Sequence, residues 1–283
     1  MATKALFNTV VNWFIRQRID QIQNFINHPI ETQNGVLFSQ LYHAENTDYG
    51  KIHGFSSISS YEDFCKNVPI VTYEDFEPYI ERARQGQPDV FWPGYIRKFA
   101  KSSGTTNAKS KFIPISEESL EDCHFKAGKD LLSIYANNHP ENSLFSNKNL
   151  RLGGSSELYE DFNTKFGDLS AIMIENLPFW VEITTTPSKK VSLMSEWESK
   201  LKAIISEVKN EDVGSMTGVP SWMMVLLQRT LADTGKQTIS EIWPNLEVFF
   251  HGGISFTPYR EQYRKIIGKD INYYEIYNAS EGF

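Results

Sequence analysis

The sequence predicts an α/β fold in which β-sheets are flanked by helices. Two observations support this prediction. Strand-like runs and helical patterns alternate through the second half of the chain, which is typical of α/β proteins. The chain also provides for a substantial core, with 283 residues of which 40% are hydrophobic and 13% aromatic. Because the sequence contains no internal repeat, low-complexity tract or linker, we expect one domain over residues 1–283.

Apolar spacing and capping signals predict the helices. Thr72-Tyr73-Glu74-Asp75 has the pattern of a capping box, and Pro220 suits the first turn of an apolar helix that ends before Gly235. We expect the first helix to dock on the body of the protein, because a membrane-surface helix carries more Lys and Arg. The predicted helices cover residues 5–27, 72–86, 116–135, 195–208 and 220–234.

Extended runs between these helices predict the strands. Most are short apolar segments with β-branched or aromatic side chains, which fit a pleated and half-buried surface. The predicted strands cover residues 95–100, 112–115, 150–155, 181–185, 246–250 and 271–277.

Charge and hydropathy exclude several classes of function. The formal net charge of −7 argues against a nucleic-acid partner, because the phosphate backbone demands a basic face. The sequence shows no apolar leader and no run near the ~18 apolar residues of a membrane span. Its only cysteines, Cys65 and Cys123, are too few for a disulfide framework. We therefore expect a soluble cytoplasmic protein without membrane association or a nucleic-acid partner, and leave its oligomeric state open.

A polar loop between two predicted strands has the composition of a phosphate site. Glycine lets the backbone turn its N–H groups toward an anion, hydroxyls donate to phosphate oxygens, and lysine supplies a cation. The strand–loop–strand setting argues against a Walker loop, whose lysine opens a helix. The alternative is a polar surface turn without a ligand. This segment, the phosphate loop, contains Ser102, Ser103, Gly104, Thr105, Thr106, Lys109 and Lys111.

Two later segments follow predicted strands. His251-Gly252-Gly253 lies where a flat ligand could approach the backbone, with a tight turn into a helix near Thr257 as an equal alternative. Tyr277 and Glu281 lie four residues apart, where a ring could stack on a base and a carboxylate could hold Mg²⁺. The alternative for this pair is a core tyrosine and a solvated glutamate.

The order of these segments resembles a known superfamily. The phosphate loop and Tyr277-Asn278-Ala279-Ser280-Glu281 are similar to the corresponding motifs of adenylate-forming enzymes, which include acyl-CoA synthetases, peptide-synthetase adenylation domains and luciferases. The double serine, Phe112-Ile113-Pro114 and residues 251–256 look more specifically like the Gretchen Hagen family of acyl acid-amido synthetases and its bacterial relatives.

This resemblance implies an activity and a fold. Such enzymes bind ATP, Mg²⁺ and a carboxylic acid, form an acyl-adenylate, and transfer the acyl group to an amine, typically an amino acid. The fold would be the large N-terminal domain of an adenylate-forming enzyme. An acyl-CoA ligase that forms a thioester, or a non-catalytic module that binds a nucleotide or acid, is the alternative.

The resemblance also implies roles for individual residues. Lys111 and Glu281 would be catalytic, with Glu281 also contacting Mg²⁺. The nucleotide-binding residues would be Ser102, Ser103, Gly104, Thr105, Thr106, Lys109, Gly252, Gly253, Tyr277 and Ser280. The substrate-binding residues would be His251, Ser255, Phe256 and Val219.

The sequence departs from the family pattern at several positions. Lys101, Ala108 and Ser110 stand where the family usually has threonine, glycine and proline. Because an alanine at 108 would stiffen the loop, we expect weaker ATP binding but not its loss. The chain ends at Phe283, directly after the glutamate motif. We therefore expect an N-terminal fragment that lacks the hinge and the small C-terminal domain, with little or no activity in isolation.

Overall fold

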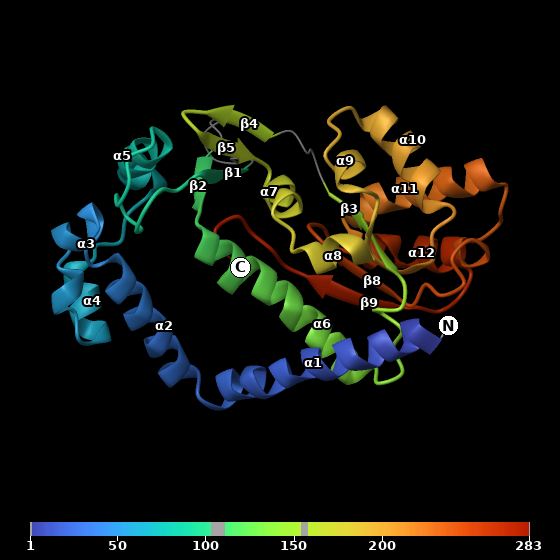
Figure 1. The fold of residues 1–283 in the computed structure, drawn as a ribbon, viewed down its shortest axis with the longest axis horizontal. Helices are drawn as coiled ribbons and strands as arrows, with labels where there is room; N and C mark the ends of the chain where they lie inside the picture. Colours follow the sequence, from blue (N-terminus) through green and yellow to red (C-terminus); the bar gives the residue numbers. More distant parts are fainter. Residues whose placement is uncertain (1, 103–110, 154–157, 283) are drawn as a thin grey trace. The chain divides into compact units, whose positions relative to one another are not determined.

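A computed structural model describes residues 2–102, 111–153 and 158–282 (Figure 1). Its contacts divide the chain into two compact units. Unit 1 comprises Met1–Arg18, Ala127–Glu157 and Ser170–Phe283, and unit 2 comprises Ile19–Lys126 and Leu158–Leu169. Each unit is described separately, and the assignment of residues 1–283 to one domain stays a prediction.

Unit 1 contains a sheet of five strands in the order β6-β3-β7-β8-β9. All neighbouring strands in it are parallel. Because a parallel sheet needs cover on both faces, helices from several parts of the sequence pack against it. The strands are β3 (Lys148–Leu152), β6 (Thr185–Thr186), β7 (Val213–Gly218), β8 (Val248–Gly252) and β9 (Asn272–Ile276).

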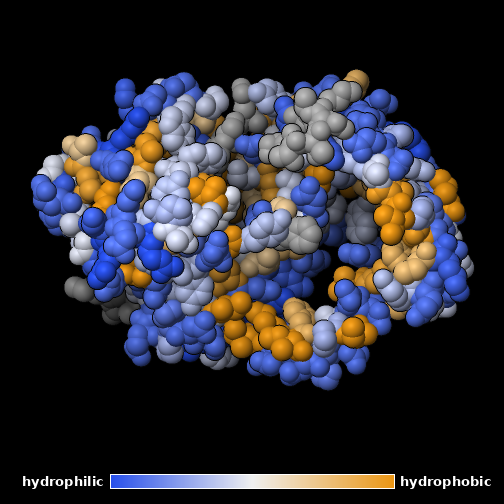
Figure 2. All heavy atoms as spheres, turned by 180° about the vertical axis from the view of Figure 1, so that it is seen from behind, coloured by the Kyte–Doolittle hydropathy of each residue, from blue (hydrophilic) through white to orange (hydrophobic). Residues whose placement is uncertain are grey.

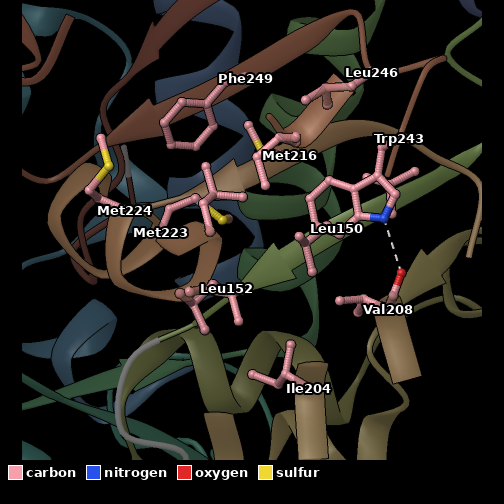
Figure 3. Packing of buried hydrophobic residues seen from close by; sticks show 14 of the residues in the cluster. Leu150, Leu152, Ile204, Val208, Met216, Met223, Met224, Trp243, Leu246 and Phe249 are labelled. Carbon is pink, nitrogen blue, oxygen red and sulfur yellow. Dashed lines mark hydrogen bonds between the residues drawn. The ribbon is translucent and has the colours of Figure 1, made fainter. Parts of the chain in front are cut away.

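One face of this sheet carries the larger hydrophobic core (Figure 3). Met216 of β7 and Phe249 of β8 contribute to it and are fully buried. Trp243 lies in the same cluster, and its Nε1 donates a hydrogen bond to the carbonyl of Val208 over 3.1 Å. The helices that contribute most side chains to this core are α10 (Trp197–Val208), α11 (Pro220–Thr234) and α12 (Arg260–Ile267).

The opposite face is covered by α6 (Lys126–Asn138). Tyr135 of α6 packs with Val248 and Phe250, which alternate with Phe249 along β8. Because successive side chains of a strand point to opposite faces of the sheet, β8 contributes side chains to the cores on both faces.

The first helix, α1 (Ala2–Asn27), confirms the helix predicted over residues 5–27. Its residues up to Arg18 belong to unit 1, where Arg18 pairs with Asp130 at 2.6 Å. Several apolar side chains of this helix reach the surface instead of the core, including Trp13 at 67% exposure. Apolar side chains likewise interrupt the hydrophilic surface in several places in Figure 2.

Unit 2 contains a sheet of four strands in the order β2-β1-β5-β4. β1 and β2 pair antiparallel, as do β4 and β5, whereas β1 and β5 are parallel. The guanidinium carbon of Arg84, at the end of α5, lies 3.9 Å from the ring centroid of Phe112 on β2. These elements are β1 (Lys98–Ser102), β2 (Lys111–Ile115), β4 (Leu158–Asp161), β5 (Thr164–Gly167) and α5 (Tyr73–Arg84).

Shorter helices complete the described chain. A π-helix at Ser119–Phe125 precedes α6, and the Oγ of Ser116 accepts a hydrogen bond from the Ser119 N–H over 3.0 Å. The others are α2 (Pro29–Ala44), α3 (Asp48–Ile52), α4 (Tyr61–Asn67), α7 (Leu169–Glu175), α8 (Phe179–Thr184) and α9 (Lys189–Ser192), with 3₁₀ turns at Phe55–Ser57, Ile239–Glu241 and Thr257–Tyr259. Within the described residues, no helix has the length and hydropathy that a membrane span needs.

The predicted α/β class is confirmed, as are all the predicted helices. The strand predicted over residues 181–185 is wrong, because α8 occupies Phe179–Thr184 and only Thr185 joins a strand. The prediction also missed β7 and the β4–β5 hairpin. The predicted strand over 150–155 corresponds to β3, and residues 154–157 lie outside the described part of the chain.

Candidate functional site

The candidate site in unit 1 lies where β7, β8 and β9 end. Gly218 at the end of β7 pairs with His251 of β8, and Gly252 pairs with Ile276 of β9. Because the three strands are parallel, their carboxyl ends meet at one edge of the sheet, where open α/β sheets bind ligands. The structure therefore brings together the predicted positions Val219, 251–256 and 277–281.

The paired glycines are required by the packing of the chain itself. A Cβ atom on Gly252 would lie 2.3 Å from the carbonyl oxygen of Ile276. Gly253 has a φ of +83°, and a Cβ there would lie 3.3 Å from Cγ2 of Val219. Residues 252 and 253 themselves carry no side chain, which is compatible with the close approach of a flat ligand to the backbone but does not require one.

His251 and Phe256 form a buried aromatic pair beside these glycines. His251 is 3% exposed, Phe256 is 4% exposed, and their ring centroids lie 4.2 Å apart. The Nδ1 atom of His251 is enclosed without a hydrogen-bond partner among the described residues. Burial lowers the pKa of His251; Arg260 lowers it further and Glu275 opposes the shift. The imidazole is therefore held toward its neutral form, as a wall of the site and not as an exposed cation.

The segment after β9 presents its side chains to solvent. Tyr277 is 80% exposed and Glu281 is exposed, whereas Ser280 is partly buried. The alternative that Tyr277 is a core residue is therefore excluded. An accessible ring and an accessible carboxylate fit the roles of a base-stacking side chain and a Mg²⁺ contact.

A metal held entirely by protein is not supported at this edge. The part of the chain that the structure describes contains no group of three or more His, Cys, Asp or Glu side chains arranged to hold a metal ion. Glu281 as a single carboxylate fits Mg²⁺, which keeps several waters and takes other ligands from phosphate groups.

The phosphate loop belongs to unit 2 and joins β1 to β2. Ser102 and Lys111 are Cα partners in this antiparallel pair, so both ends of the loop lie together. The strand–loop–strand placement is thus confirmed, and a Walker loop is excluded. The Nζ atom of Lys111 lies 5.0 Å from the ring centroid of Tyr73, whose hydroxyl accepts a hydrogen bond from the Phe112 N–H over 2.9 Å. The predicted positions Ser103, Gly104, Thr105, Thr106 and Lys109 lie outside the described residues.

One charged residue of the sheet was not recognised from the sequence. Arg151 lies on β3, next to its last residue Leu152, in a strand that lies between β6 and β7. The signal that could have identified it is the interruption of the apolar run Leu150-Arg151-Leu152 by a cation.

Comparison with known families gives a match over most of the chain. The model of the GH3 family N-terminal domain matches residues 18–271. The jasmonoyl-L-amino acid synthetase JAR6 of Nicotiana attenuata is 32% identical over 104 residues, which are 36% of this chain and 18% of that protein. The indole-3-acetic acid-amido synthetase GH3.15 of Arabidopsis thaliana is 38% identical over 93 residues, which are 32% of this chain and 15% of that protein.

Solved structures share the fold. The GH3.15 acyl acid amido synthetase superimposes with a TM-score of 0.72 and 15% identity over 94% of this chain and 56% of that chain. The same type of enzyme in complex with 2,4-DB gives a TM-score of 0.66 at 18% identity, over 89% of this chain and 53% of that chain. This chain therefore spans a little over half the length of the solved chains and aligns with less than a fifth of the curated relatives.

Proposed function

Because the chain belongs to the GH3 family, we propose that it forms the N-terminal adenylation domain of an acyl acid-amido synthetase. The observation that carries this proposal is the family match over residues 18–271. The shared fold and the relatives named as amido synthetases support it.

The proposed reaction has two steps. An oxygen of the carboxylic acid attacks the α-phosphorus of ATP, and pyrophosphate leaves. The nitrogen of an amine, typically an amino acid, then attacks the acyl carbon, and AMP leaves as the amide bond forms. A carboxylate is a poor acyl donor, and adenylation turns one of its oxygens into a good leaving group. The protein contributes mainly by orienting the phosphates and stabilising their charge.

ATP and Mg²⁺ are part of the proposal, with roles carried over from the family resemblance. Mg²⁺ would neutralise phosphate charge when bound, and Glu281 would contact it. The hydroxyls and backbone of the phosphate loop would bind phosphate oxygens, with Lys111 as the supporting cation. Tyr277 has the accessible ring that stacking on adenine needs.

The substrate-binding roles also belong to the proposal. Val219 lies against Gly253, and Ser255 is exposed, so both are available at the sheet edge. The buried pair His251 and Phe256 would act as a wall that fixes the position of this edge. A cytoplasmic location, where ATP is available, completes the proposal.

The first experiment separates an enzyme from a binding module. Exchange of labelled pyrophosphate into ATP is measured on the full-length protein with a panel of carboxylic acids. Acid-dependent exchange supports adenylation, whereas background exchange with every acid supports a non-catalytic module. The panel includes aromatic, indolic and aliphatic acids, since the relatives are named for jasmonoyl and indole-3-acetic acid products.

A second experiment separates the two enzyme classes. The adenylating protein is supplied with the active acid and either amino acids or coenzyme A, and the products are identified by mass spectrometry. Amide formation supports the synthetase, and thioester formation supports the acyl-CoA ligase.

A further inference from the structure

Arg151 occupies an unusual position in the parallel sheet of unit 1. It lies on β3, which is enclosed between β6 and β7, and its Cα partner on β7 is Thr217. Its neighbours Leu150 and Leu152 point into the larger core. The alternation of side chains along a strand places Arg151 on the opposite face, where a buried parallel strand normally carries an apolar residue.

The guanidinium of Arg151 has no hydrogen-bond or ion-pair partner among the described residues. Its Nε atom is enclosed and unpartnered. Glu182 of α8 attracts the cation electrostatically, but that side chain is exposed and forms no ion pair with it within the described chain. Burial lowers the pKa of Arg151 to about 10 against the attraction of Glu182, which expresses the cost of enclosing the charge.

Two other enclosed arginines of the described chain pair with carboxylates, whereas Arg16, whose Nε is likewise enclosed and unpartnered, donates to a backbone carbonyl over 2.6 Å. Arg18, at 6% exposure, pairs with Asp130 at 2.6 Å. Arg84, at 18% exposure, pairs with Glu81 at 2.7 Å and also lies over Phe112. Arg151 has neither a carboxylate nor a carbonyl as hydrogen-bond partner among the described residues, and an enclosed cation in that situation is the arrangement expected of a binding residue.

The surroundings of Arg151 on this face are polar. Asn149, two residues earlier on the same strand, donates hydrogen bonds to Ser215 Oγ over 2.9 Å and to Thr217 Oγ1 over 3.1 Å. Ser215 is 1% exposed. Two hydroxyls and an amide thus lie beside the cation, in a sheet layer that packing alone would fill with apolar side chains.

We propose that Arg151 receives the carboxylate of a small organic acid in a subsite at the carboxyl end of β3, beside Thr217. The planar guanidinium fork matches a carboxylate in shape and can donate two parallel hydrogen bonds to it. One cation balances the single negative charge of a carboxylate, whereas a phosphate dianion would remain half compensated. Both substrates of the proposed reaction, the acid and the amino acid, carry this group, and the choice between them rests on the proposed function.

The test is equilibrium binding to the 283-residue chain by calorimetry. The probes for the acid are benzoate and hexanoate, and the probe for the amino acid is glycine. Their methyl esters serve as uncharged controls, and inorganic phosphate serves as an anion that is not a carboxylate. The variants are Arg151→Gln and Arg151→Lys. Arg264→Gln is the control, because Arg264 is a surface arginine whose side chain is 69% exposed and whose Nε lies 3.9 Å from Oδ1 of Asp270.

Arg151→Gln is expected to weaken binding of at least one carboxylate probe by about tenfold or more, the loss typical of a hydrogen bond to a charged group. Arg151→Lys should retain part of the affinity for that carboxylate, and Arg264→Gln should leave the affinity unchanged. Weaker binding of benzoate or hexanoate identifies the acid as the occupant, and weaker binding of glycine identifies the amino acid. Binding that Arg151→Gln leaves intact, absence of binding by every carboxylate, or preference for phosphate would overturn the proposal.

Thermal unfolding of the Arg151 variants distinguishes a loss of binding from a loss of folding. Because an unpaired enclosed charge is destabilising, Arg151→Met should unfold at the same temperature as the unchanged chain or higher. A clear fall in the unfolding temperature of Arg151→Met would instead assign Arg151 to the support of the fold. Carboxylate binding is measured without ATP. A failure of this proposal can therefore be told apart from a failure of the proposed function, which pyrophosphate exchange tests.

Discussion

The ring of His251 stacks on the ring of Phe256, with centroids 4.2 Å apart and planes 23° from parallel. Both side chains are buried, whereas Gly253, Ile254 and Ser255 between them are exposed. The stack therefore fixes both ends of a short exposed segment at the carboxyl edge of the sheet. The backbone of this edge is held in place without depending on a ligand.

The buried imidazole predicts a dependence of stability on pH. Burial lowers the pKa of His251 below its ordinary value of about 6.5, so the unfolded chain takes up a proton in a range where the folded chain does not. The free energy of unfolding should then fall as the pH drops below that value. His251→Phe keeps an aromatic ring at this position but has no titratable group. The free energy of unfolding in urea should therefore depend less on pH in this variant between neutral and mildly acidic pH. An identical dependence in both proteins would exclude His251 as its source.

The close approach of Gly252 and Ile276 predicts a large effect of one methyl group. A Cβ on residue 252 would lie 2.3 Å from the Ile276 carbonyl oxygen, so Gly252→Ala must displace backbone. We expect it to lower the free energy of unfolding by about 1–3 kcal/mol, the range for overpacked interiors. Gly128→Ala is the matched control, because Gly128 lies in α6 and an added methyl group there would meet nothing within 4 Å. That control should raise stability by roughly 0.5–1 kcal/mol, as Gly→Ala does inside helices. Equal stability changes in the two variants would contradict the packing argument.

The exposed ring of Tyr277 predicts a loss of ATP affinity without a loss of stability. Tyr277→Ala should weaken ATP binding by about 1–3 kcal/mol, the usual worth of base stacking, and Tyr277→Phe should retain most of the affinity. Tyr42→Ala, at a position that is 71% exposed in unit 2, should leave ATP binding unchanged. Calorimetric titration with ATP and Mg²⁺ measures all three. Unchanged affinity in Tyr277→Ala would remove Tyr277 from the nucleotide site.

The phosphate loop predicts a similar separation of binding from stability. The combined change Ser103→Ala with Lys111→Ala removes a hydroxyl donor and a cation, so ATP binding should weaken measurably. Thermal stability should change little, because the interaction that the described residues show for the Lys111 side chain is a weak one, with its Nζ 5.0 Å from the ring centroid of Tyr73. A large drop in the unfolding temperature would support the alternative that this segment is a structural turn.

Elements with strong local signals were predictable from the sequence. Pro220 lies at the start of α11 and the helix ends before Gly235, as the pattern predicted; Gly235 takes the left-handed conformation at a φ of +68°. The capping box at Thr72 is also present. The capping box satisfies backbone groups at the start of α5, and the Gly235 N–H donates to the carbonyl of Leu231 at the end of α11, so each signal is contained in a short stretch of sequence.

Elements defined by tertiary pairing were not predictable in this way. Val213–Gly218 contains two glycines and two hydroxyl residues, and it is a strand because β3 and β8 pair with it on either side. Conversely, Val181–Thr185 has β-branched side chains but forms mostly helix, which begins after Pro178. The tertiary environment of a segment outweighs a difference in strand propensity of about 1 kcal/mol.

The candidate site likewise contains segments that local sequence signals predicted and one residue that they did not. The segments at 251–256 and 277–281 were found because they follow strand ends, and the parallel register of β8 and β9 brings them together. The isolated cation Arg151 was missed, because its significance depends on the absence of a partner among the described residues, which only three-dimensional placement reveals.

The most direct test of the proposed function is acid-dependent exchange of labelled pyrophosphate into ATP by the full-length protein. We predict exchange above background with at least one carboxylic acid, its loss in Glu281→Gln, and conversion of that acid to an amide when an amino acid is added. Exchange that stays at background with every acid, or a thioester with coenzyme A in place of the amide, would contradict the assignment of this chain to an acyl acid-amido synthetase.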